Sequence, residues 1–139
     1  MKTCKLLREQ VAAATGSKKA ELVLKNAQIV NVFTQSVETG DIAIEGGYIV
    51  GIGNYEGITE KDLGGAYVCP GFLDGHIHIE SSMTSPGEFE RAVVPHGTIA
   101  VITDPHEIAN VAGTAGIRFM MQSAQKLDLD VYFMLPSCV

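Results

Sequence analysis

The stretch that decides the fold is residues 71–82, GFLDGHIHIESS, which we interpret as a buried strand that ends in a polar loop. Successive side chains of a strand alternate between its two faces. One face therefore carries the polar members of the stretch, which are Asp74, His76, His78 and Glu80. The opposite, apolar face carries Leu73, Ile77 and Ile79.

Two imidazoles on one face of a strand can converge on a single cation. Neutral imidazole is a good ligand for zinc, manganese, iron or nickel, and carboxylates extend the choice toward harder ions. A lone His-x-His pair is a weak signal, but His76 and His78 lie on an apolar strand among acids and glycines. The alternative is two hydrogen-bonded histidines at a strand end. We favour the metal-ligand interpretation because two unpaired imidazoles are costly to bury.

The composition indicates a soluble, cytoplasmic protein. The chain has 139 residues, of which 46% are hydrophobic and 19% charged, enough for one ordinary core. Its net charge of -6, with no stripe of basic residues, argues against a nucleic-acid or anionic-membrane partner. No secretory signal or membrane-length apolar run is visible. Three widely spaced cysteines, Cys4, Cys69 and Cys138, suit free thiols in a reducing compartment.

The first half of the chain predicts a helical leader over residues 1–19 and a small antiparallel β-domain over residues 20–70. The leader has helical periodicity over 6–14 and a stop at Gly16. The β-rich segments are 22–24, 27–32, 41–45, 48–52 and 67–69. The pair Gly46-Gly47 suits a tight hairpin turn. This half contains no titratable cluster and no phosphate-binding glycine loop.

After residue 70 the pattern changes to alternating strand and helix. Proline-containing helix starts lie at 85–88 and 104–107, and a helical region with a break near Gly113 follows the second of them. The run 99–102 is apolar on both faces, as a buried parallel strand requires, and 131–135 is a third buried strand. The order β-α-β-α-β over residues 71–139 predicts parallel strands with right-handed crossovers.

The polar groups fall at the C-terminal ends of these strands, where such folds bind ligands. Glu80 and Ser81 follow the first strand, and the third is followed by Ser137 and Cys138. The second strand is followed by Asp104, His106 and Glu107. Asp104 and Glu107 have a second interpretation as helix N-terminal caps. His96 lies at the opposite end of the second strand, so we expect it to be structural.

Residues 70–78, PGFLDGHIH, resemble the first-strand signature of the amidohydrolase superfamily of metal-dependent hydrolases. The preceding β-domain is similar to part of that superfamily's small β-sandwich. Three further strings are similar to the bacterial adenine deaminase family: 78–82 HIESS, 104–111 DPHEIANV and 130–139 DVYFMLPSCV. The resemblance covers the chain from about residue 20 to its end.

The resemblance implies an α/β fold, the N-terminal part of a (β/α)₈ TIM-type barrel preceded by a β-sandwich segment. It implies a hydrolase that converts adenine and water to hypoxanthine and ammonia with a divalent metal, Mn²⁺ first and Fe²⁺ or Zn²⁺ next. His76 and His78 match the first-strand metal ligands. Glu80 and His106 are catalytic candidates. Candidates for contacts to the substrate or to the metal-binding side chains are Glu80, Ser81, Asp104 and Glu107.

Residues 71–139 provide only three strands, whereas a full barrel needs about 250 residues. We therefore expect the barrel to be incomplete here, the chain to be a fragment that is inactive by itself, and a homo-oligomer to be one way of covering its open strand edge. Two alternatives stay open: another amidohydrolase that acts on a cyclic amide, and a non-catalytic module. His78-Ile79-Glu80 fits half of the His-x-Glu deaminase signature, but no Cys-x-x-Cys accompanies it.

Overall fold

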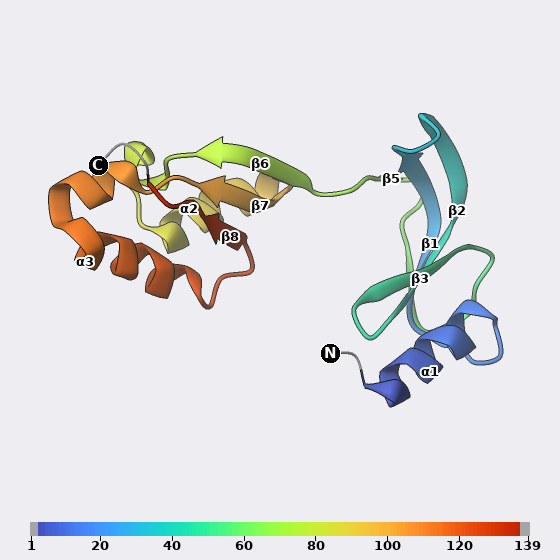
Figure 1. Cartoon of the computed structure of the whole chain (residues 1–139). Coiled ribbons are helices and arrows are strands. Elements are labelled where there is room, and N and C mark those ends of the chain that lie inside the picture. Colours follow the sequence, from blue (N-terminus) through green and yellow to red (C-terminus); the bar gives the residue numbers. More distant parts are fainter. Residues whose placement is uncertain (1–2, 137–139) are drawn as a thin grey trace. The chain divides into compact units, whose positions relative to one another are not determined.

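The computed structural model describes residues 3–136 and divides between Pro70 and Gly71 into two compact units (Figure 1). We call them the β unit, which ends at Pro70, and the α/β unit, which begins at Gly71. Ser137 and Cys138, which sequence analysis places after the third strand, lie outside the described residues.

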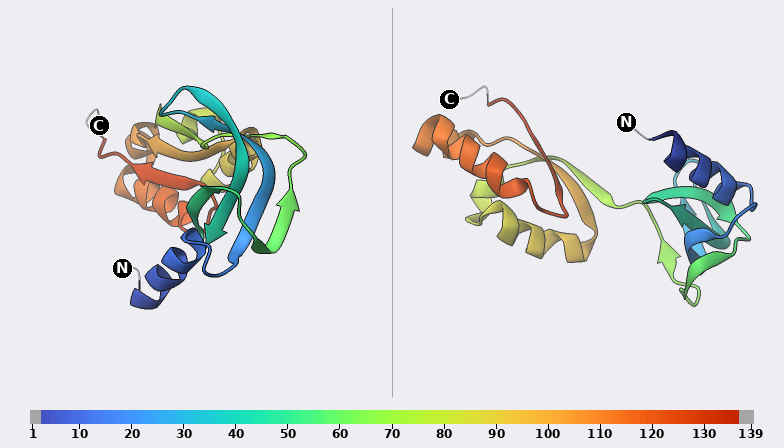
Figure 2. Two further views of the ribbon diagram at one scale, coloured as in Figure 1. Left: turned by 90° about the vertical axis from the view of Figure 1, so that its right-hand side faces the viewer. Right: turned by 90° about the horizontal axis from the view of Figure 1, so that it is seen from below.

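The β unit begins with helix α1 (Cys4–Ala14), whose N-cap Thr3 accepts the Leu6 N–H through its hydroxyl at 3.3 Å. Five strands follow: β1 (Ala20–Asn31), β2 (Ser36–Glu45), β3 (Tyr48–Gly53), β4 (Gly57–Asp62) and β5 (Tyr67–Val68). Antiparallel pairing joins β1 to β2 and β2 to β3 (Figure 2). Both β4 and β5 pair in parallel with the other edge of β1.

The prediction of a purely antiparallel domain is therefore wrong. The strand that sequence analysis missed is β4, with the sequence GITEKD. Its side chains after Gly57 are all exposed, so no buried face leaves an apolar alternation in the sequence. Backbone pairing with β1 alone makes it a strand.

A bulge in β1 is fixed by one acid of β2. The register shifts between Leu24 and Ala27, where Asn26 has a φ of 57°. The buried Asp41 carboxylate accepts the Asn26 N–H at 3.1 Å and forms an ion pair with Lys25. Burial raises the pKa of Asp41, but these bonds and one from the Tyr55 N–H outweigh it, so the net pKa is lowered.

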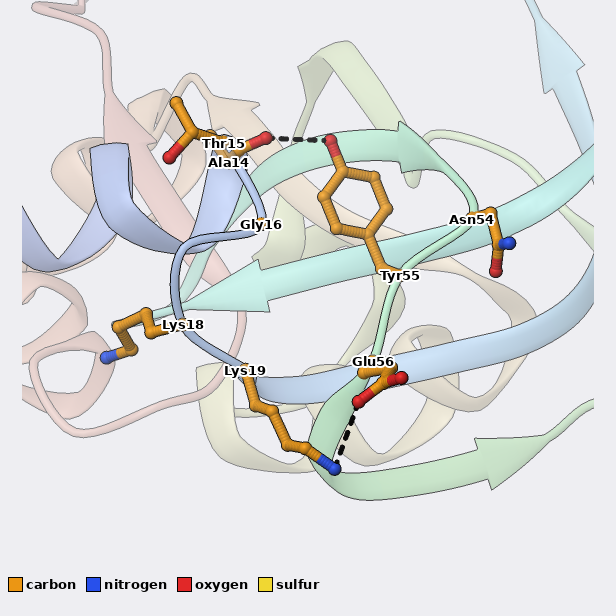
Figure 3. Close-up of a pocket in the computed structure, with 8 residues that line it drawn as sticks. All are labelled: Ala14, Thr15, Gly16, Lys18, Lys19, Asn54, Tyr55 and Glu56. Carbon is orange, nitrogen blue, oxygen red and sulfur yellow. Dashed lines mark hydrogen bonds and ion pairs between the residues drawn. The ribbon is translucent and has the colours of Figure 1, made fainter.

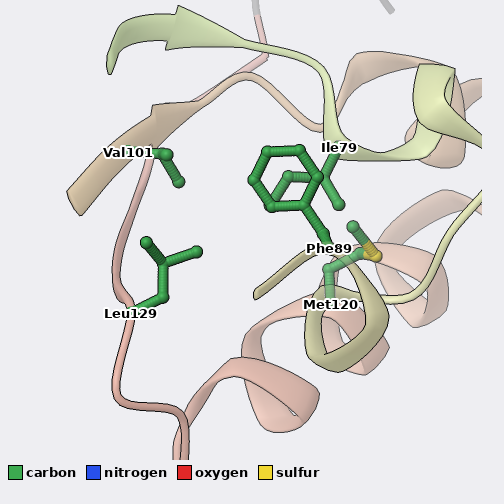
Figure 4. Packing of buried hydrophobic residues seen from close by; sticks show 5 residues of the cluster. All are labelled: Ile79, Phe89, Val101, Met120 and Leu129. Carbon is green, nitrogen blue, oxygen red and sulfur yellow. The ribbon is translucent and has the colours of Figure 1, made fainter. Parts of the chain in front are cut away.

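The α/β unit contains a parallel sheet in the order β6-β7-β8: β6 (Phe72–Ile77), β7 (Thr98–Thr103) and β8 (Asp130–Phe133). Between the strands lie η1 (Ile79–Ser82), α2 (Pro86–Val93), η2 (Val94–His96) and α3 (His106–Ala124). The strands and helices share one core, formed by Ile79, Phe89, Val101, Met120 and Leu129 (Figure 4). The predicted order and parallel direction of the elements are confirmed, as is the break at Gly113 inside α3.

The predicted alternation along residues 71–82 holds for two residues of the apolar face. Ile79 is buried in the core, and Ile77 packs against it. The alternation is wrong for Leu73, which is 72% exposed, and for Glu80, which lies on η1. The cause is a register shift between Asp74 and Ile77, followed by the end of the strand at Ile77. In β7 likewise the run predicted to be buried on both faces is only partly covered, because Ile99 is 50% and Ile102 41% exposed.

Candidate metal centre

The candidate site forms where β6 and β7 end. His78 comes directly after β6, and Asp104 directly after β7. The Asp104 N–H donates to the Ile77 carbonyl at 2.9 Å, and the Met134 N–H donates to the Thr103 carbonyl at 2.8 Å. These bonds continue the parallel pairing one step past the strands, so the backbone that carries the polar side chains is fixed.

The two histidines of the β6 segment converge. Their Nε2 atoms are 3.1 Å apart, and the rings meet edge to face with centroids 4.9 Å apart. Two ligand atoms about 2.1 Å from one ion, at about a right angle to each other, are about 3 Å apart. The spacing of His76 and His78 therefore suits a shared cation, and it equally suits a hydrogen bond between the two rings, the alternative interpretation of this pair. Asp74 accepts the His76 N–H at 3.1 Å, within the bulged part of β6.

Glu107 orients His78. Its Oε2 is 3.0 Å from His78 Nδ1, and its Oε1 accepts the Ser81 hydroxyl at 2.8 Å. A proton on Nδ1 leaves the lone pair of Nε2 free for a cation. Burial raises the pKa of Glu107, but the Ser81 bond and the neighbouring His106 and His78 outweigh it, and the net pKa is lowered.

Glu80 holds the start of α3 in place. Its Oε1 accepts the Ile108 N–H at 3.2 Å, whereas the N-cap residue, Pro105, makes no side-chain cap bond. The alternative interpretation of Asp104 as the cap of this helix is therefore wrong, whereas Glu107, the other cap candidate, lies in its first turn. The Glu80 side chain, 28 positions before Ile108, caps the helix instead. Sequence periodicity does not indicate a contact between residues so far apart. The other oxygen, Glu80 Oε2, is buried without a hydrogen-bond partner among the described residues.

His106 completes the cluster. Its ring centroid is 4.6 Å from that of His78. Its Nδ1 is 3.5 Å from Asp104 Oδ2, and its Nε2 is 3.7 Å from Glu107 Oε2. His78, Asp104 and His106 each present one ligand atom within 4.8 Å of the others. His96, expected to be structural, lies apart from them in η2, before β7.

Basic side chains are almost missing from this part of the sequence. From residue 62 to residue 117 the only Lys or Arg is Arg91, which pairs with Glu88 at 3.3 Å. The acids of the cluster therefore have histidines and hydroxyls as neighbours. Such a set of donors attracts a cation, and its carboxylates can also accept and return a proton.

A pocket of about 460 Å³ in the β unit has a different character (Figure 3). Its two lysines are paired: Lys19 with Glu56 at 3.1 Å, and Lys18 with two glutamates at 2.7 and 2.9 Å. The Tyr55 hydroxyl donates to the Ala14 carbonyl at 3.1 Å. The Lys18 pairs and the Tyr55 bond join α1 to the sheet, and the Lys19 pair joins the segments that precede β1 and β4. Within residues 3–136, no helix is long and apolar enough to cross a membrane.

Comparison with known proteins agrees with the resemblance found in the sequence. Residues 67–139, more than half of the chain, match the amidohydrolase family. This chain belongs to that family. The matched segment contains every residue of the candidate site, from His76 to Glu107.

Individual amidohydrolases match over almost the whole chain. Adenine deaminase 2 of Carboxydothermus hydrogenoformans is 58% identical over 135 residues, 97% of this chain and 24% of that protein. Adenine deaminase of Geobacillus kaustophilus is 59% identical over 133 residues, 96% of this chain and 23% of that protein. The chain thus spans about a quarter of the length of these relatives.

A solved structure supports the fold. N-acyl-D-glutamate deacylase of Bordetella bronchiseptica, complexed with zinc and a phosphonate inhibitor, has a TM-score of 0.51 and 21% identity to this chain. The similarity covers 62% of this chain and 19% of that one. At this level of identity the comparison concerns the fold, and it agrees with a mixed α/β architecture.

Proposed function

We propose that this chain supplies the first metal-binding strand of an enzyme that deaminates adenine, converting adenine and water to hypoxanthine and ammonia. One observation carries the proposal: His76 and His78 converge at 3.1 Å in a chain 58% identical, over 135 residues, to an adenine deaminase. The surrounding donors, two carboxylates and a third histidine, suit hydrolysis at a polarised carbon.

The residues present fit a divalent cation. His76 and His78 would hold it through Nε2, and Mn²⁺ is our first choice because carboxylates surround the histidines, with Fe²⁺ and Zn²⁺ next. When bound, such an ion lowers the pKa of water toward neutrality and so supplies a nucleophile. The remaining ligands belong, in this proposal, to strands outside residues 1–139.

The other residues of the cluster act on these two histidines or on the substrate. Glu107 accepts the His78 Nδ1 proton, which fixes the tautomer, and Ser81 holds Glu107 in place. Glu80 fixes the start of α3 and with it His106 and Glu107. We assign Asp104 and His106 to contacts with the substrate or with the two metal-binding histidines. Glu80 is then a positioning residue, and His106 remains a candidate for proton transfer.

We further propose that the α/β unit is the first part of a (β/α)₈ barrel and that the β unit is part of a β-sandwich. Parallel β6, β7 and β8 with helices between them support the first assignment. The exposure of Leu73, Ile102 and Tyr132 supports it too, because these side chains would face the interior of a closed barrel. We also propose a cytoplasmic location, which the widely spaced cysteines suit, and a homo-oligomer as one way of covering an open strand edge.

The test places the 139-residue chain in the position of the matching segment of Geobacillus kaustophilus adenine deaminase. We expect the chimaera to convert adenine to hypoxanthine, followed by ultraviolet absorbance and ammonia release. His76→Ala should abolish turnover, and His96→Ala, a histidine outside the cluster, should preserve it. A folded, metal-loaded chimaera that hydrolyses a cyclic amide such as a hydantoin, and not adenine, would contradict the proposal.

A further inference from the structure

Helix α3 consists of two segments that meet at Gly113. There the backbone has a φ of 57° and a ψ of -148°, a combination that essentially only glycine adopts. The first segment, residues 106–112, carries His106 and Glu107, two polar side chains of the candidate site. The remainder of the helix is anchored in the core of the α/β unit by Met120. The direction of the first segment relative to this anchor is therefore set at a glycine.

The first segment folds back onto the second at Gly116. Eight residues of a straight α-helix span about 12 Å, so Ile108 and Gly116 could not touch if α3 were continuous. A Cβ built on Gly116 would nevertheless lie 2.7 Å from Ile108 Cγ1, 2.8 Å from the Ile108 carbonyl oxygen and 3.1 Å from Ala112 Cβ. The first two distances are far inside the separation of about 3.5 to 4.0 Å at which carbon atoms attract each other. Any side chain at position 116 would therefore displace Ile108.

Ile108 holds the polar side chains that precede it in α3. None of the residues of the first segment is buried, so a few contacts decide where this segment lies. Glu80 Oε1 accepts the Ile108 N–H at 3.2 Å, the Ile108 side chain packs against the core, and the Ile108 carbonyl lies against Gly116. Glu107, the neighbour of Ile108 in the chain, is placed by these contacts, and its Oε2 is 3.0 Å from His78 Nδ1.

We infer that Gly113 and Gly116 form a glycine joint that places Glu107 against His78 and so sets the tautomer of this histidine. Both glycines act through Ile108, so they are positioning residues. Relieving the contacts of a side chain at position 116 requires a shift of roughly 1 Å, which is enough to lengthen the 3.0 Å contact beyond hydrogen-bond reach. The inference deepens the proposed function and rests on it for the role of His78 as a metal ligand.

The experiment observes the His78 ring in the metal-free 139-residue chain, with EDTA present. Imidazole ¹H–¹⁵N correlation spectra distinguish a ring nitrogen that carries a proton from one that does not, and loss of signals in His78→Gln assigns them. We compare Gly116→Ala with Gly113→Ala, which acts on the backbone alone because nothing lies within 4 Å of its added Cβ. Gly87→Ala in α2 is the matched control, since its added Cβ would meet Leu127 at an ordinary 3.9 Å.

We expect His78 to carry its proton on Nδ1, beside Glu107, in the unchanged chain and in Gly87→Ala. In Gly116→Ala and Gly113→Ala the ratio of the Nδ1–H to the Nε2–H tautomer should fall about fivefold, which corresponds to the loss of one ordinary hydrogen bond. Gly116→Ala should have no further effect in a chain that already carries Glu107→Ala, because the glycine acts through that carboxylate.

Four results would overturn the inference. They are an Nε2–H tautomer of His78 in the unchanged chain, a tautomer ratio in the joint variants equal to that of Gly87→Ala, an added effect of Gly116→Ala in the Glu107→Ala chain, and loss of the fold in both joint variants. Far-UV circular dichroism checks the fold, and if one joint variant unfolds, the other decides. Loss of the fold in both would show that the glycines serve the whole unit. Each result leaves the adenine proposal standing, because that proposal is judged by turnover of the chimaera and its His76→Ala variant.

Discussion

The acidic side chains of the two units have different partners. In the β unit, carboxylates face lysines: Asp41 pairs with Lys25, and Glu9 and Glu45 both pair with Lys18. A lysine stays charged at neutral pH and completes the pairing, so these contacts hold the fold together. The hydrogen bond between Asp41 and Lys25 lowers the pKa of the carboxyl group and raises the pKa of the ammonium group.

At the candidate site of the α/β unit the carboxylates face histidines instead, whereas Glu88 on α2 pairs with Arg91. Glu107 contacts His78, and Asp104 lies beside His106. A neutral imidazole keeps a lone pair, so the group as a whole can still take a cation. The lysine pairs are therefore complete structural contacts, whereas the histidine pairs keep a lone pair and form the candidate binding site.

The units also differ in what fills their cores. The β unit buries mainly small side chains: Ala13 of α1 clusters with Ala20 and Ala43 of the strands, and Ala27 belongs to a second cluster. The α/β unit buries larger ones, with Ile79 at 0% exposure beside Phe89. A core of large side chains depends more strongly on each member, because each deletion leaves a larger cavity.

The largest effect should come from Ile79→Asp. It places an unpaired charge in the centre of the α/β core and should destabilise this unit by about 4 kcal/mol. Hydrogen exchange followed by mass spectrometry reads each unit separately. Amides of β7 should lose protection while those of β1 and β2 keep it.

Met83→Asp is the matched control, four positions away and at a side chain that is 94% exposed. It should change protection little in either unit. If Ile79→Asp leaves β7 as protected as Met83→Asp does, Ile79 is not a core residue of the folded chain.

A smaller effect is expected in the β unit from Asp41→Ala. This change removes the acceptor of the Asn26 N–H and leaves Lys25 without its carboxylate. The expected loss is about 2 kcal/mol in urea denaturation, from a buried donor left unpaired. Glu56→Ala removes a comparable but exposed pair with Lys19 and should cost less than about 0.5 kcal/mol. Equal losses in the two variants would show that the Asp41 contact has no special structural role.

The same contact sets a pH dependence for the β unit. Because the pKa of Asp41 is lowered on folding, its contribution is present above the unfolded value near 3.8 and is lost as pH falls through the lower folded value. The pKa of Lys25 is raised, chiefly by the Asp41 bond, so its contribution is lost as pH rises from about 10.5 through the higher folded value.

The urea midpoint of the β unit should therefore be flat between these limits and fall outside them. Asp41→Asn should lower the urea midpoint in the flat range and make its fall at low and high pH less steep. Part of the pH dependence should remain, because the Lys18 ion pairs are still present. The measurement is a series of urea titrations from pH 3 to pH 11. If the urea midpoint of Asp41→Asn falls as steeply at both ends of the pH range as that of the unchanged chain, groups other than Asp41 and Lys25 cause the pH dependence.

The order of elements was predictable because it depends on local patterns. Apolar runs of strand length, proline at helix starts and Gly113 inside α3 each act over a few residues. The convergence of His76 and His78 was also accessible, since an i, i+2 spacing needs only the period of a strand. Their role as metal ligands stays a prediction.

Contacts that join distant segments were not predictable in the same way. Strand β4 has an exposed, charged sequence and exists through pairing with β1. The cap of α3 comes from Glu80, 28 positions before its partner Ile108. The bulge between Asp74 and Ile77 contains Gly75, a residue that can mark a bulge, but the register is set by pairing with β7. In each case the deciding partner is brought close only by the tertiary fold.

The smallest change in stability should accompany Glu107→Gln. The side chain is 40% exposed, and glutamine retains an oxygen for the Ser81 hydroxyl, so the loss should stay below about 0.5 kcal/mol. Affinity for Mn²⁺ should nevertheless fall about tenfold, because the variant removes the negative charge that makes His78 a stronger base. Isothermal titration with Mn²⁺ measures the affinity, and urea denaturation measures the stability.

Glu88→Gln, which removes an acid paired with Arg91 on the exposed face of α2, is the control and should change neither the affinity nor the stability. A stability loss in Glu107→Gln as large as that of Asp41→Ala, with Mn²⁺ affinity unchanged, would erase the contrast between the units, because the Glu107 contact would then be structural as well.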